Sequence, residues 1–60
     1  MAHAELSTIA TTLADLTTRV TEQADRAQHA GDEERAVDLY DVERSLQAAA
    51  RRLAACLRRT

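Results

Sequence analysis

The sequence predicts an all-α protein, an antiparallel two-helix hairpin that pairs with a second copy into a four-helix bundle. Apolar residues recur at steps of three and four in both halves of the chain, which is the spacing of amphipathic helices. The only glycine, Gly31, lies at the midpoint of 60 residues that contain no proline. A chain of this length makes at most one domain, residues 1–60.

The first predicted helix covers about residues 4–30. Its apolar residues form a heptad seam, in which two positions of every seven face a neighbouring helix. One position of the seam holds Leu6, Leu13, Val20 and Ala27, and the other holds Ile9, Leu16, Gln23 and Ala30. Ala10, Thr17 and Ala24 lie beside the seam and are expected to widen it slightly.

The second predicted helix covers about residues 32–59 and repeats this pattern. Its seam holds Leu39, Leu46 and Leu53 at one position and Val42, Ala49 and Cys56 at the other, with Ala36, Ala50 and Leu57 beside them. This apolar stripe is broader than that of the first helix. The second helix is therefore expected to contact more than one neighbour.

The turn between the helices is predicted at Gly31. Glycine is preferred just past a helix end, where the backbone turns left-handed. Asp32 follows and is a preferred N-cap for the second helix, and Glu33 and Glu34 suit the positive end of its dipole. So short a connection makes the helices antiparallel, with residues facing each other whose numbers sum to about 62.

A homodimer is expected because the core of one hairpin is thin. Thirteen residues are alanine, and Cys56 is the only cysteine, so no disulfide within the chain can add stability. Residues 32–43 carry six acidic side chains against Arg35, whereas the only charged residues of 44–60 are five arginines. Two such helices packed antiparallel across a two-fold axis would place acidic ends beside basic ends, although the helix dipole also favours this polarity.

Four arginines near the C-terminus are candidate contacts for a partner or for phosphate groups: Arg51, Arg52, Arg58 and Arg59. They form two pairs seven residues apart and could bind a nucleic acid or lie on an anionic membrane. They could equally be solvated residues beside the seam. A net charge of −2 and a single aromatic residue, Tyr40, make nucleic-acid binding the less favoured alternative.

The predicted architecture resembles that of the Rop-type hairpin dimers of plasmids, which bind RNA. The resemblance covers the length of the chain and its single short turn. It is one of architecture, because the sequence shares no motif with them. It implies a small nucleic-acid-binding hairpin as the alternative function.

Three smaller features each allow two interpretations. The stretch 6–18 has one charged residue, Asp15, and its outward hydroxyl residues could form a partner surface or a plain solvated face. Val37 and Tyr40 could pack over the end of the first helix or form a contact patch, with Arg44 stacked on the Tyr40 ring. The hairpin brings His3 near Cys56, so a dimer could form a metal or thiol sensor, although a buried cysteine usually acts as a small hydrophobic residue.

The expected function is that of a small, non-enzymatic interaction or regulatory protein. Catalysis needs a pocket with positioned groups, which two slim helices do not offer, and no cofactor or metal is expected. The expected partners are a second copy of the chain and a larger protein. No segment approaches the roughly 18 apolar residues of a membrane span. A single cysteine fits a reducing compartment, so a cytoplasmic location is expected.

Overall fold

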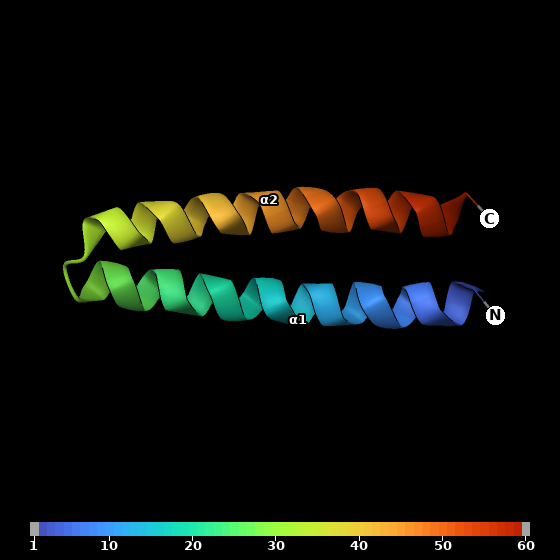
Figure 1. The fold of residues 1–60 in the computed structure, drawn as a ribbon, viewed down its shortest axis with the longest axis horizontal. Helices are drawn as coiled ribbons and strands as arrows, with labels where there is room; N and C mark the ends of the chain where they lie inside the picture. Colours follow the sequence, from blue (N-terminus) through green and yellow to red (C-terminus); the bar gives the residue numbers. More distant parts are fainter. Residues whose placement is uncertain (1, 60) are drawn as a thin grey trace.

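The computed structural model describes residues 2–59 and is a hairpin of two long antiparallel helices (Figure 1). Helix α1 spans Ala2–His29 and helix α2 spans Glu33–Arg58, so the predicted helical hairpin is confirmed. Their bounds differ by one or two residues from the predicted ranges 4–30 and 32–59. The molecule measures 45 × 15 × 10 Å, because one layer of two helices makes up the whole of the described chain.

The hinge between the helices is tight because its backbone groups find partners within the turn. Gly31 has a φ of 81°, the left-handed conformation that closes a helix. Its N–H donates to the Gln28 carbonyl at 3.1 Å, and the Asp32 N–H donates to the Ala27 carbonyl at 2.9 Å. The Asp32 carboxylate then accepts from the Arg35 N–H at 3.2 Å and caps α2. Gly31 thus ends α1, and Asp32 begins α2.

Small side chains form the contact between the two helices. Ala24, Ala27 and Ala36 are 0%, 7% and 4% exposed, and Thr17 is 9% exposed. The Thr17 hydroxyl donates to the Leu13 carbonyl at 2.8 Å, which satisfies its hydrogen-bonding capacity inside the contact. No large side chain of residues 3–59 is fully buried. The helices are therefore held by close approach of their backbones rather than by bulky interdigitating residues.

On α1 the contact with α2 includes only half of the predicted seam. The position of Leu6, Leu13 and Val20 is half-buried, and Ala27 of the same position is buried. The other predicted position is exposed, and its members are Ile9, Leu16, Gln23 and Ala30. Thr17 and Ala24, expected only to widen the seam, lie at its centre instead, because small residues let the helices approach most closely.

On α2 the same correction applies. Leu39, Leu46 and Leu53 are half-buried, as are the flanking Ala50 and Leu57. The second predicted position, Val42, Ala49 and Cys56, is exposed. The expectation of a buried Cys56 is wrong for the single hairpin. One neighbouring helix covers only a narrow stripe, so the broad apolar surface of α2 extends beyond it.

Candidate interaction surface

The two broad faces of the hairpin differ in chemistry. We define the polar face by Thr21, Asp25 and Gln28 of α1 together with Tyr40 and Glu43 of α2. The Thr21 hydroxyl hydrogen bonds to the Glu43 carboxylate. The Tyr40 hydroxyl donates to Oδ1 of Asp25 at 2.6 Å and lies 2.9 Å from Oε1 of Gln28. These contacts tie the helices together along one side.

The tyrosine of the polar face has a perturbed acidity. The hydrogen bond to the Asp25 carboxylate raises the pKa of Tyr40, with smaller contributions from desolvation and from the negative charges of Asp25 and Glu43. Each of these effects favours the neutral phenol over the phenolate. The Tyr40 hydroxyl therefore remains a hydrogen-bond donor at neutral pH.

The opposite side carries uncovered aliphatic residues, and we call it the apolar face. It is formed by Ile9 and Leu16 of α1 and by Val42, Ala49 and Cys56 of α2, all exposed. Ile9, Leu16 and Val42 are 47%, 43% and 45% exposed. Within each helix these residues recur every seven positions, so they form one continuous stripe. A continuous apolar stripe of this kind is a candidate surface for packing on another protein.

Helix geometry places both parts of this stripe on the same face. At about 100° per residue, Leu16 lies to one side of the buried line through Thr17 and Ala24, and Thr21 lies to the other side. Viewed from the N-terminus of its own helix, Val42 is rotated away from the buried line through Ala36 in the same sense as Leu16 is from Thr17. Because α1 and α2 are antiparallel and face each other, both rotations lead to the same side of the hairpin. A groove of about 310 Å³ between the helices, lined partly by Leu16 and Leu39, opens on this face.

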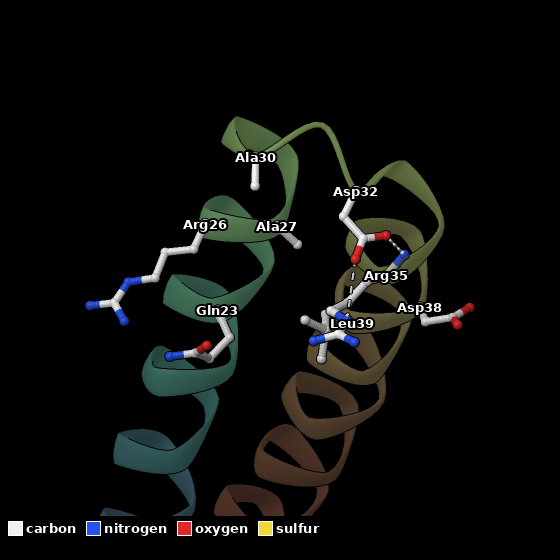
Figure 2. A pocket seen from close by; sticks show the side chains of 8 residues that line it. All are labelled: Gln23, Arg26, Ala27, Ala30, Asp32, Arg35, Asp38 and Leu39. Atoms are coloured by element: carbon white, nitrogen blue, oxygen red, sulfur yellow. Dashed lines mark hydrogen bonds and ion pairs between the residues drawn. The ribbon is translucent and has the colours of Figure 1, made fainter.

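The hinge end of the apolar face is polar. A shallow groove of about 580 Å³ lies there, between Gln23 of α1 and Leu39 of α2 (Figure 2). Arg35 lines it and is paired with Asp32 at 3.4 Å. Arg26 and Asp38 also line it, and Figure 2 shows their side chains extending away from its centre on opposite sides. The apolar stripe thus ends before the hinge.

The four candidate arginines Arg51, Arg52, Arg58 and Arg59 are all exposed. A guanidinium nitrogen of Arg59 lies 3.7 Å from the Cys56 sulfur, at the chain-end limit of the apolar face. No ion pair with an acidic residue is present at these four arginines within residues 2–59. Their charge is therefore available to solvent or to a partner.

The smaller candidate features are partly resolved. The hydroxyls of Thr8, Thr11 and Thr18 donate to backbone carbonyls four residues earlier. Val37 is 59% exposed and lines a groove together with Gln28 of α1 and with Tyr40. Arg44 forms an ion pair with Asp41 within α2, in place of the expected stacking on the Tyr40 ring.

His3 is in the first turn of α1 and Cys56 is in the last turn of α2. Figure 1 shows these two helix ends side by side at the open end of the hairpin. Cys56 is a free, exposed thiol. The part of the chain that the structure describes has no group of three or more His, Cys, Asp or Glu residues placed to hold a metal ion. Neither helix in residues 2–59 has the length and hydrophobicity needed to cross a membrane.

No family model, curated protein or solved structure matches this chain.

Sequence reasoning identified the residues of the apolar face but assigned them to the contact within the hairpin. It did not identify Thr21, Asp25 and Glu43 as partners across the helices. Each is polar, but the rule that facing residues sum to about 62 places Asp25 opposite Val37 rather than Tyr40, so the sequence gives no usable signal for the pairing. Pairing them requires knowledge of which side of the seam each helix turns toward its neighbour.

Proposed function

We propose that the protein works through protein–protein contacts, as a small non-enzymatic interaction module that self-associates as a homodimeric four-helix bundle. Exposed Ile9, Leu16 and Val42 on one face carry this proposal. Each is already about half covered by its own helix, and a second copy would remove the rest from water. The hydrophobic gain is about 25 cal/mol per Å² of apolar surface buried.

The thin contact within the hairpin supports the same proposal. A single interface built around three alanines and a threonine offers little apolar area for a chain of this size. Oligomerisation is a common way for chains below about 70–80 residues to reach stability. A second hairpin on the apolar face would cover the stripe and complete a four-helix core.

Sedimentation equilibrium, with circular dichroism on the same samples, tests self-association. We expect a helical dimer at micromolar concentration. Leu16→Gln, at the middle of the apolar face, should weaken dimerisation at least tenfold, which corresponds to about 1.4 kcal/mol. Thr18→Gln, exposed on the same helix but away from that face, is the matched control and should leave dimerisation unchanged.

A folded or weakly helical monomer at all concentrations would contradict self-association. In that case, the apolar face would be assigned to contact with a larger protein. Where the dimer forms, we propose a larger protein as its further partner, bound outside the apolar face that the second copy covers. We propose that the protein has a regulatory role and acts in the cytoplasm, because a free exposed thiol such as that of Cys56 suits a reducing compartment.

Nucleic-acid binding is the second candidate function, supported by the exposure of Arg51, Arg52, Arg58 and Arg59 near the open end. Two pairs of arginines, two helical turns apart, can neutralise phosphate charges of a nucleic acid. A mobility shift of RNA or DNA that weakens with salt and disappears in the four-fold Arg→Gln variant would support this function. Capture of a specific protein by that same variant would favour the interaction module.

A further inference from the structure

We infer that the two copies pair with their hinges at the same end, so that α1 of each copy lies on α2 of the other. This inference rests on the proposed self-association and adds the arrangement of the four helices. In the alternative arrangement the hinges lie at opposite ends, and each helix lies on its own counterpart. Both arrangements are two-fold symmetric and both make neighbouring helices antiparallel.

The uneven distribution of apolar residues along the apolar face distinguishes the two arrangements. Cys56 and Ile9 lie toward the open end, Ala49 and Leu16 near the middle, and Val42 slightly beyond it toward the hinge. Toward the hinge the same positions hold Gln23 and Arg35, which line the groove there, and the only apolar residue among them is the small Ala30. The apolar stripe is therefore displaced toward the open end.

Placing the hinges together superimposes the two stripes along their whole length. At 1.5 Å per residue, Ile9 of one copy then lies near the level of Cys56 of the other, and Leu16 lies between the levels of Ala49 and Val42. Gln23 lies near the level of Arg35, where the grooves face each other. Apolar residues thus meet apolar residues, and the polar ends remain together beside solvent.

If the hinges lie at opposite ends, apolar residues of one copy face polar residues of the other. Ile9 of one copy would lie at the level of Gln23 of the other, and Cys56 at the level of Arg35. Burying an amide or guanidinium against aliphatic side chains is unfavourable unless its hydrogen bonds are replaced. Only the central part of each stripe would find an apolar partner.

Charges at the rim of the apolar face support a second copy as its occupant. Arg26 and Asp38 line the same groove but form no ion pair within the described residues. With the hinges together, Arg26 of each copy comes level with Asp38 of the other. The rim charges also suit the arrangement with the hinges apart, because Arg26 then comes level with Glu5 of the other copy. The distribution of apolar residues is therefore what distinguishes the two arrangements.

Pulsed dipolar spectroscopy between nitroxide labels tests the arrangement. A label on Ala30→Cys, in a Cys56→Ala background, lies at the hinge end of α1. With the hinges together we expect the two labels within about 25 Å, because the two α1 helices then lie across a diagonal of the bundle, about 1.4 times the 8–10 Å spacing of adjacent helix axes. A separation close to the 45 Å length of the hairpin would overturn the inference.

A label on Arg19→Cys, near the middle of α1, is the matched control. Both arrangements place its two labels well within the length of the hairpin, so dipolar coupling there shows that the dimer forms. Absence of dipolar coupling at Arg19 would contradict the proposed self-association itself. Coupling at Arg19 with a long distance at Ala30 would leave the dimer standing and reject only the arrangement. Circular dichroism verifies that each labelled chain is helical.

Discussion

At the scale of single residues, Tyr40 reports on the contact between the helices because it is the only tyrosine of the chain. Its hydroxyl donates to Asp25 at 2.6 Å, and this bond raises the pKa of Tyr40. The folded chain then holds the phenol proton more tightly than the unfolded chain. The stabilisation from this contact is present below pH about 10 and is lost as the pH rises through the folded pKa.

We predict that Asp25→Asn lowers the pKa of Tyr40 toward its ordinary value. The substitution removes the carboxylate that accepts the bond and supplies negative charge, while it preserves side-chain volume. Ultraviolet absorbance of the phenolate, followed through an alkaline titration, measures the change. The wild-type chain in denaturant gives the unfolded reference. Equal midpoints for the two folded chains would show that the contact is absent.

Gly31 offers a second test at this scale. A Cβ added there meets no atom within 4 Å, so only the φ of 81° opposes a side chain. Gly31→Ala should lower the free energy of unfolding by about 1–2 kcal/mol, the cost of a left-handed alanine. Gly31→Asn should cost less, because asparagine tolerates this conformation. Urea denaturation compares the variants, and an unchanged Gly31→Ala would mean that the hinge is not left-handed.

The hinge could be predicted from the sequence, and the polar face could not. Gly31 and Asp32 each have a backbone role that local chemistry specifies. The pairing of Thr21 with Glu43 instead depends on the rotation of each helix about its axis. Heptad spacing constrains that rotation only to within the width of the apolar stripe.

At the scale of the helices, close approach along small residues explains why the predicted seam was only half right. Ala24 is 0% exposed, whereas Leu16 is 43% exposed. The heptad spacing of the apolar residues placed Leu16 in the seam and Ala24 beside it. In the hairpin, the line of Thr17, Ala24 and Ala27 faces α2. The side chain of Leu16 stays exposed and is free to contact another helix.

We predict that Ala24→Leu destabilises the hairpin by about 1–3 kcal/mol, because a larger side chain at a fully covered position forces the helices apart. Ala14→Leu is the control: the same substitution at an exposed position should change stability by no more than about 0.5 kcal/mol. Urea denaturation followed by circular dichroism measures both. Equal stability of the two variants would place the helix contact elsewhere.

At the scale of the whole molecule, folding and self-association should be coupled. We predict that the Tm of the wild-type chain rises with protein concentration, because association stabilises the folded state by mass action. The Tm of Leu16→Gln should vary much less over the same range. Thermal melts at several concentrations test this, and a constant wild-type Tm would indicate that one hairpin folds alone.

The distribution of buried residues also has a consequence for the order of folding. Thr17, Ala24, Ala27 and Ala36 are the buried positions, and all lie between mid-length and the hinge. Contacts beside the hinge close short loops, while each contact toward the open end closes a longer one at greater entropic cost. The chain should zip from Gly31 outward and open from its free ends inward. Amide hydrogen exchange would then be slowest beside the hinge and fastest in the first turn of α1 and the last turn of α2.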